Sequence, residues 1–400
     1  MFNRGKTIDL TYIAAIRFPT EKAHGVAIAK MGEALVKQGV RLELIAPRRR
    51  QLQQLRDTDW KKFYSIRDRF PVTRLWCLDL LWFNYYIPAW LQAFTFYLLI
   101  ISFEISLFGY LIRKKSKLVY TRDMLLVPLL IILGKKVYFE AHSWPSNSMV
   151  IWFYRLIAAK LSGITCISQP LIKEFVKLGI SSNKLLLAPS AVSKEFFKKR
   201  NKLQARKKLK LPLRKKIITY AGSLNQDKGI LTLLRAAARL KQRKDILFLI
   251  IGGNFVEEKE RSVINKTAKS ANLKLLGFRP YVEIPSYLAA SDILVLPNSA
   301  KSKKPIFRKY TSPLKLYEYL ASGRPVIASQ VAAFINIVKD KKEVLFFKPD
   351  NSQDLACKIC QLLENKKLSS LLGQKGRKLV AGVDWEARAQ AVLSFIHKNI

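Results

Sequence analysis

Hydrophobic residues along the chain follow two alternating patterns. Short aliphatic runs typical of buried strands alternate with longer stretches in which apolar residues recur every three or four positions, as in amphipathic helices. In the first half, the predicted strands are 9–16, 40–46, 117–121, 136–141, 163–168 and 184–188, and the predicted helices are 24–38, 88–113, 123–133, 146–161 and 169–178. In the second half, strands are predicted at 216–221, 246–251, 292–296, 325–329 and 343–347, and helices at 229–242, 313–322 and near the C-terminus. Such alternation predicts parallel, doubly wound α/β sheets.

The alternation is interrupted once, between residues 194 and 216. This stretch holds twelve Lys and Arg residues and one acid, Glu195, and it is interpreted as surface elements at a domain junction. The length of 400 residues suggests two or three domains. We therefore predict two Rossmann-like domains, residues 1–190 and 191–383, that face each other across a cleft.

One segment has the length and composition of a transmembrane span. From Ile87 to Ile112 only Glu104 is charged, and the basic sequence RKKSK follows. Predicted strands lie on both sides of this segment in the sequence. If they share one sheet, a membrane crossing would place them on opposite sides of a bilayer. A buried crossover helix is therefore favoured, with a helix partly inserted in one leaflet and a true span as the alternatives.

The chain is strongly basic, with a net charge of +43. Residues 1–190 contain 28 basic and 12 acidic residues, and residues 191–400 contain 43 and 16. A field of this sign favours anionic partners, namely phosphate-bearing small molecules, acidic membranes or nucleic acid, and does not choose among them. The N-terminal sequence lacks the pattern of a cleavable signal, which favours a cytoplasmic location.

Two short motifs suggest metal or redox chemistry, but a structural interpretation is preferred for both. Cys357 and Cys360 form a CxxC motif within an amphipathic helical pattern that lacks a second pair of ligands. Asp57 and Asp59 form a DxD motif in an irregular stretch that no predicted strand enters, so they are interpreted as solvated acids. No metal site is predicted.

The helix predicted at 313–322 has an unusual first turn. Ser312 suits an N-cap and Pro313 the first helical position, but Lys315 stands where a capping box would place an acid. A cation there opposes the helix dipole unless an anion docks on the free amides with help from Lys315. Glu318 falls on the same helix face and suits a cis-diol such as ribose. An ordinary exposed Lys–Glu pair explains the spacing equally well.

Two other groups of residues follow predicted strands, where ligands bind in doubly wound sheets. In the sequence YAGSLNQDKGI a strand leads to Gly222, and Lys228 then precedes a helix. Glycine lets a ligand approach the backbone closely, and lysine supplies charge for phosphate. His24 follows the first strand in the loop RFPTEKAHG, and His142 follows strand 136–141. Two of the three histidines are thereby placed at the predicted cleft.

Taken together, these residues resemble the family-4 retaining glycosyltransferases of the GT-B fold, which transfer a sugar from a nucleotide donor. The matching segments span nearly the whole chain: FPTEKAHG, FEAH (139–142), ISQPLIKEF (167–175), AGSLNQDKG, LLGFRP (275–280), SPLKLYEYLASGRPVIAS and DWEARAQAVLSFI. The resemblance implies a GT-B fold in which the final helix, residues 384–400, packs back on the first domain.

On the donor side, the resemblance implies that Glu318 holds the ribose hydroxyls and that the amides around Lys315 cradle the diphosphate. Lys228 matches a phosphate-binding lysine of the family. The other donor-side residues expected by resemblance are Gly25, Gly222, Ser223, Gly277, Arg279, Tyr310, Ser312, Pro313 and Leu314.

On the acceptor side, the resemblance makes His142 the catalytic-site histidine that faces the transferred sugar. The other residues expected there are Arg17, Thr20, Glu21, Lys22, His24 and Arg122.

Two positions depart from the family pattern. Tyr310 replaces the first glutamate of the E-x7-E element, which contacts a hydroxyl of the donor sugar in the family. Ser223 replaces an arginine of the phosphate loop, so Lys228 and Lys315 are left as the expected cations, with the basic run 301–309 as a further source of charge.

The resemblance therefore predicts a metal-independent hexosyl- or related transferase with no cofactor. It would move a sugar from a nucleotide-sugar to a glycan or lipid-linked acceptor, with retention, as in the assembly of cell-surface polysaccharide. Basic charge and segment 87–112 favour a peripheral position on the inner face of the cell membrane. A nucleotide-sugar epimerase of the same fold is the alternative. A nucleic-acid-binding protein is disfavoured, because stacking motifs that interleave aromatic and basic residues are not evident.

Overall fold

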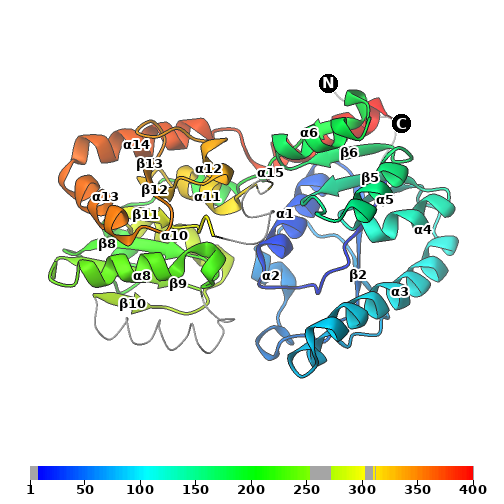
Figure 1. Cartoon of the computed structure of the whole chain (residues 1–400), viewed down its shortest axis with the longest axis horizontal. Coiled ribbons are helices and arrows are strands. Elements are labelled where there is room, and N and C mark those ends of the chain that lie inside the picture. The colour runs from blue at the N-terminus through cyan, green and yellow to red at the C-terminus, as the bar shows by residue number, and fades with distance from the viewer. Residues whose placement is uncertain (1–7, 253–271, 302–309, 311, 400) are drawn as a thin grey trace. The chain divides into compact units, whose positions relative to one another are not determined.

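The computed structural model describes residues 8–252, 272–301, 310 and 312–399 (Figure 1). The chain divides into two compact units: unit 1 comprises Met1–Pro189 and Trp385–Ile400, and unit 2 comprises Ser190–Asp384. Each unit contains one parallel sheet with helices around it. The prediction of two Rossmann-like, doubly wound domains is confirmed.

The sheet of unit 1 has seven parallel strands in the order β3-β2-β1-β4-β5-β6-β7. The strands are β1 (Asp9–Ile13), β2 (Arg41–Pro47), β3 (Val72–Leu75), β4 (Leu118–Thr121), β5 (Lys136–Ala141), β6 (Gly163–Cys166) and β7 (Leu185–Leu187). The α-helices are α1 (Ala23–Lys37), α2 (Trp60–Tyr64), α3 (Ala89–Arg113), α4 (Val127–Ile132), α5 (Ser148–Ala158), α6 (Gln169–Lys177) and α15 (Trp385–Lys398). The strand order reverses between β1 and β4, and the carboxyl edge at this switch point is where such sheets bind ligands.

Helix α15 belongs to unit 1 although it follows unit 2 in the sequence. It packs along α1. The rings of Phe395 and Tyr138 meet edge-on with their centroids 6.0 Å apart, and Lys37 of α1 pairs with Glu386 at 3.2 Å. This is the place that the family resemblance implies for the final helix.

The sheet of unit 2 has six parallel strands in the order β10-β9-β8-β11-β12-β13. The strands are β8 (Lys216–Ala221), β9 (Ile246–Ile251), β10 (Leu273–Leu275), β11 (Ile293–Leu296), β12 (Val326–Ser329) and β13 (Leu345–Phe347). The α-helices are α7 (Lys202–Lys208), α8 (Ile230–Arg239), α10 (Ile284–Ala290), α11 (Leu314–Ala321), α12 (Ala332–Ile335), α13 (Ser352–Glu364) and α14 (Lys366–Leu379). Successive residues of β8 enter opposite cores, Ile217 with α10 and α11 and Ile218 with α8 and α13.

Strands β3 and β10 and helix α10 are not predicted by the hydrophobic pattern. The sequence of β3 is VTRL, and all four of its side chains keep some exposure. Strand β10 has only three residues, LKL, and none of them is fully buried. Both strands lie at the edge of their sheet, where one side is unpaired and a continuous apolar run is not required.

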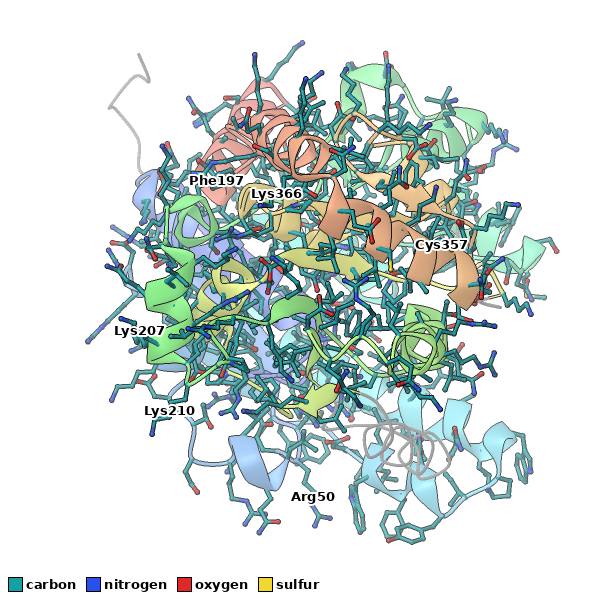
Figure 2. The ribbon with its side chains drawn as sticks, turned by 90° about the vertical axis from the view of Figure 1, so that its left-hand side faces the viewer. Arg50, Phe197, Lys207, Lys210, Cys357 and Lys366 are labelled. Atoms are coloured by element: carbon teal, nitrogen blue, oxygen red, sulfur yellow. The ribbon has the colours of Figure 1, made fainter. Side chains whose placement is uncertain are left out.

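The basic stretch 194–216 is a surface element only in part. It forms the 3-10 helix η5 (Lys194–Phe197) and α7. The side chain of Arg206 is buried and pairs with Asp292 at 2.6 Å. Lys207 and Lys210, labelled in Figure 2, are exposed. The surface interpretation is therefore wrong for Arg206, whose charge is neutralised inside the fold.

The fold gives the DxD motif a structural role and reveals no role for the CxxC motif. Cys357, labelled on α13 in Figure 2, is exposed, Cys360 is half-buried, and both are free thiols. Asp59 is the N-cap of α2 and accepts the Lys61 amide at 2.9 Å. Within the part of the chain that is described, no three His, Cys, Asp or Glu side chains are grouped to hold a metal ion.

Helix α3, the long cyan helix of Figure 1, is the one helix of the described chain that is long and apolar enough to cross a membrane. It connects β3 to β4, and β4 is hydrogen-bonded to β1. The chain before and after α3 therefore lies in one sheet, which excludes the span considered above. One helix face, with Leu99, Phe103 and Leu107, is buried in unit 1. The prediction of a buried crossover helix is correct for that face only, because the opposite face is exposed.

Candidate functional site

The carboxyl edge of the unit 2 sheet brings together residues from two distant segments. Strand β8 leads to Gly222, the 3-10 helix η6 (Gln226–Lys228) and α8, whereas Lys315 lies on α11. Strands β8 and β11 are neighbours, and the strand order reverses between them. The switch point predicted to bind a ligand therefore holds both lysines.

Lys315 directs its ammonium group at Gly222. A Cβ atom built on Gly222 would lie 1.8 Å from Lys315 Nζ, so glycine leaves the room that the ammonium occupies. Lys315 Nζ also lies 5.6 Å from the ring centroid of Tyr220, a cation–π contact. Burial and the nearby charge of Lys228 lower the pKa of Lys315 to about 7, although Glu318 raises it.

Lys228 is the second cation at this edge. Burial lowers the pKa of Lys228 to about 8, against the charge of Asp227, which raises it. The charge of Lys228 lowers the proton affinity of Lys315, and a bound polyanion would stabilise both ammonium groups in their charged form.

Glu318 is buried on α11, with 5% of its surface exposed, and its Oε1 atom has no hydrogen-bond partner among the described residues. Burial raises the pKa of Glu318 to about 7, although the hydrogen bond from Tyr281 and the charge of Lys315 lower it. A buried acceptor without a donor costs free energy, and a ligand hydroxyl would supply that donor. The alternative of an exposed Lys–Glu pair is therefore wrong, because Glu318 is inside the fold.

Helix α11 begins one residue later than predicted. Pro313 is the N-cap in an extended conformation, and the first helical residue is Leu314. Ser312 does not cap the helix, because its hydroxyl accepts the backbone N–H of Ser190 at 2.8 Å. Lys315 is thus the second helical residue. Within the described residues, the N-cap residue Pro313 provides no side-chain cap for α11. The Leu316 N–H is bonded to Pro313 O at 2.9 Å, so the amides of Leu314 and Lys315 are left for another acceptor.

Gly229 fixes the turn that places Lys228. Its φ is +67°, and a Cβ atom there would lie 1.7 Å from Pro297 O. We expect Gly229→Ala to cost about 2 kcal/mol or more in free energy of unfolding, through backbone strain and the clash, measured by chemical denaturation. Gly382→Ala is the matched control, because Gly382 also has positive φ but nothing lies within 4 Å. Equal losses in the two variants would contradict the importance of the clash.

The remaining donor-side residues lie at or after the ends of β8 and β10 or precede α11. Gly277 O accepts the Gly252 N–H at 2.8 Å, and Arg279 Nε is buried without a partner within the described chain. Tyr310 is buried and Ser223 is exposed. Residues 302–309 of the basic run 301–309 lie outside the described residues.

The carboxyl edge of the unit 1 sheet holds the predicted acceptor-side loop. Arg17 pairs with Glu21 at 2.5 Å, so much of its charge is balanced locally. The backbone of Thr20 is anchored at both ends by Tyr64, whose hydroxyl accepts the N–H and donates to the carbonyl, each at 2.6 Å. Lys22 is exposed just before α1. Gly25 is buried in the first turn of α1.

His24, Arg122 and His142 come together at this edge from three segments. Burial, followed by the charge of Arg122, lowers the pKa of His24 to about 3 and that of His142 to about 4. Both imidazoles are therefore neutral at pH 7. Arg122 Nη1 is buried without a hydrogen-bond partner in the described chain. The three residues offer a cation and neutral imidazole nitrogens to a polar ligand.

Sequence reasoning did not single out Glu140 and Arg388, which hold His142 in place. Glu140 Oε1 is hydrogen-bonded to His142 Nε2, and Oε2 accepts the Tyr120 hydroxyl at 2.5 Å and lies 3.3 Å from Arg388 Nη2 of α15. Burial favours a higher pKa for Glu140, but Arg388 and His142 outweigh it and hold that pKa well below its usual range. An ionised Glu140 takes its hydrogen bond from Nε2–H, so Nδ1 of His142 is left as an acceptor.

Comparison with known proteins supports this reading of both units. The family model "Glycosyltransferase Family 4" matches residues 25–196, and "Glycosyl transferases group 1" matches residues 201–379. Sucrose-phosphate synthase from Thermosynechococcus elongatus superposes with a TM-score of 0.76 at 18% identity, over 98% of both chains. Each unit thus matches a glycosyltransferase family model, and the chain has the GT-B fold. A second solved GT-B neighbour, Anabaena Alr3699/HepE in complex with UDP and glucose, has a TM-score of 0.72 at 15% identity, over 98% of this chain and 99% of that one.

Curated relatives match the GT-B chain over shorter stretches. D-inositol 3-phosphate glycosyltransferase of Corynebacterium aurimucosum is 26% identical over 193 residues, 46% of this chain and 44% of that protein. Alpha-D-kanosaminyltransferase of Streptomyces kanamyceticus is 22% identical over 185 residues, 46% of each chain. The chain thus spans a little under half the length of these relatives. Their names specify different substrates, so the likeness assigns neither donor sugar nor acceptor.

Proposed function

We propose that this GT-B protein transfers a sugar from a nucleotide-sugar to an acceptor hydroxyl with retention of configuration. The observation that carries the proposal is the group of Lys228, Lys315 and Glu318 at one sheet edge. The two cations suit a diphosphate, and the buried Glu318 Oε1 without a donor suits a ribose hydroxyl. A similar solved structure contains UDP and glucose, which have this chemistry.

Catalysis in this proposal is electrostatic. As the bond between sugar and diphosphate breaks, negative charge grows on the leaving oxygen. Lys228, Lys315 and the uncapped amides at the start of α11 are placed before the reaction and stabilise that charge. Because protein cations fill the role that a divalent metal has in other phosphate sites, we expect transfer to proceed without a metal and to be unaffected by EDTA.

The groups of unit 1 are proposed to bind the transferred sugar and the acceptor. His142 Nδ1 accepts a hydrogen bond from a sugar hydroxyl, and Arg122 donates to a polar group of the acceptor. The acceptor in this proposal is a glycan or lipid-linked saccharide, handled at the inner face of the cell membrane. The phenol of Tyr310 takes the place of the carboxylate that the family resemblance implies against the donor sugar.

The decisive experiment is a thermal unfolding screen against UDP-, GDP-, ADP- and dTDP-sugars. A donor present at a hundred times its Kd would stabilise the fold by about 2.7 kcal/mol. We expect the nucleotide-sugars that share one base to shift the unfolding curve more than the others. Incubation of the selected donor without acceptor then distinguishes transfer from epimerisation by the products. If none of the nucleotide-sugars shifts the unfolding curve, the proposal fails.

A further inference from the structure

Helix α3 carries a second apolar face that points away from unit 1. Its exposed apolar side chains recur every three or four residues: Phe94, Tyr97, Ile101, Ile105, Phe108 and Ile112. Trp90 extends the series toward the start of the helix, and all seven side chains are between 43% and 75% exposed. At 3.6 residues per turn these positions form one continuous stripe. Apolar residues that are scattered singly over a surface are normal. A regular stripe opposite a packed face is different and calls for an explanation.

Aromatic residues extend this stripe before the helix. Trp82, in the 3-10 helix η2 (Leu81–Tyr85), and Tyr86 are 44% and 75% exposed, and η2 contacts α3. Helix α5 repeats the pattern with Met149, Trp152 and Leu156 exposed at a spacing of three and four. Parallel crossovers are almost always right-handed, so α3, which leads into β4, and α5, between β5 and β6, cover the same face of the sheet. One side of unit 1 therefore presents two apolar stripes.

Basic groups lie at both ends of α3. At the start, the Arg50 guanidinium is stacked 4.6 Å from the ring centroid of Trp82. At the end, the turn 113–117 is joined to Lys135, whose Nζ donates to Ser116 O at 2.9 Å. Exposed cations in and beside this turn are Arg113, Lys115, Lys117 and Lys136. Within α3 the one acid is Glu104, which is half-buried, and burial raises its pKa.

We propose that the exposed stripe of α3, with the aromatic residues of η2 and the cations at both ends, docks unit 1 on an anionic lipid leaflet. The helix lies in the plane of the interface, because its other face is packed in unit 1 and cannot be surrounded by lipid. Tryptophan and tyrosine favour the interface between headgroups and acyl chains. Cations beside the apolar face attract anionic headgroups, as in interfacial amphipathic helices.

A lipid surface fits this face better than a second copy of the chain. The chain carries a net charge of +43, and like charges of this size oppose self-association. An anionic leaflet instead complements both the cations and the apolar stripe. The proposal concerns binding alone and stands independently of the proposed transfer reaction.

The test is flotation of the full chain with phosphatidylcholine vesicles, with and without phosphatidylglycerol, at physiological salt. The wild-type chain is expected to float with the anionic vesicles. The variant Phe94→Ser/Ile105→Ser is expected to lose about tenfold or more in partition coefficient, because two inserted apolar side chains are removed. Lys115→Glu/Lys117→Glu is expected to weaken binding to the anionic vesicles and to leave binding to neutral ones unchanged.

The matched control is Leu203→Ser/Val282→Ser, which removes two comparably exposed apolar side chains from unit 2. It is expected to float like the wild type, and thermal unfolding checks that every variant is folded. Two outcomes overturn the proposal. One is flotation that the α3 variant does not reduce. The other is a wild-type chain that does not float with the anionic vesicles. In that case, a dimer in analytical ultracentrifugation that Phe94→Ser/Ile105→Ser dissociates would assign the stripe to a second copy.

Discussion

Replacing Lys315 by alanine is expected to lower kcat/KM for sugar transfer by about a hundredfold or more, the usual effect of removing one preorganised group that stabilises a charged leaving group. The reason is local: Lys315 Nζ occupies the space that a Cβ on Gly222 would take, at the edge where the diphosphate is proposed to bind. Steady-state kinetics with the donor found in the unfolding screen, and a binding titration with the matching nucleoside diphosphate, measure the loss.

The control for this variant is Lys241→Ala, which removes an exposed lysine from the same unit. It is expected to change neither kcat/KM nor the affinity for the nucleoside diphosphate. The fold should tolerate Lys315→Ala, because burial and Lys228 already disfavour the charged form of Lys315, whose pKa is lowered to about 7. Unchanged donor affinity and turnover in a folded Lys315→Ala variant would remove the basis of the proposed function.

The same pKa value predicts how donor binding depends on pH. Without ligand, part of the Lys315 population is uncharged at pH 7, because burial lowers the pKa of this group to about 7. A diphosphate favours the ammonium form, so binding should take up protons, and affinity should fall as pH rises above about 7. Calorimetry in two buffers of different ionisation enthalpy detects that uptake.

Replacing Arg388 by methionine is expected to destabilise unit 1 by about 3 to 5 kcal/mol, the usual cost of leaving one partner of a buried ion pair without its countercharge. Glu140 and Arg388 are both buried, with 2% and 7% of their surfaces exposed. Chemical denaturation measures the loss. Lys398→Met is the matched control, because Lys398 is exposed on the same helix.

The way in which the stability of Arg388→Met depends on pH follows from the direction in which the pKa of Glu140 is shifted. The pKa of Glu140 in the folded wild type lies well below its usual value. Its pairing therefore contributes stability above the unfolded pKa, and the contribution is lost as pH falls through the folded pKa. In Arg388→Met the unpaired carboxylate resists ionisation, so its folded pKa should rise. The stability gap between wild type and variant should narrow toward acid pH, and a gap that stays constant would contradict the ion-pair explanation.

Most strands were predictable because each is a buried aliphatic run. KIITYA and ILFLII gave the bounds of β8 and β9 to the residue, since parallel strands covered on both faces form nearly continuous hydrophobic runs. The edge strands β3 and β10 were missed because their side chains keep some exposure and form no continuous apolar run. Helix α3 was ambiguous because a helix that is apolar all round gives no sign of which face is covered.

The candidate site was predictable where its chemistry is local. Lys315 and Glu318 stand three residues apart on one helix, so their shared face follows from the spacing. Glu140 and Arg388 lie in segments that no spacing rule connects, and only the return of α15 to unit 1 brings them together. The N-cap of α11 was misplaced because the hydroxyl of Ser312 is used by Ser190, a contact that only the tertiary fold creates.

The return of α15 also sets the order in which the protein can be completed. The N-terminal strands are synthesised first. The residue that neutralises Glu140, Arg388, belongs to α15, which is translated after all of unit 2. A nascent chain that ends before Trp385 holds this carboxylate without its countercharge and leaves the side of α1 that α15 covers bare. Unit 1 therefore reaches its final stability only after α15 has been synthesised, and premature stop codons before Trp385 should be as damaging to it as changes within its own strands.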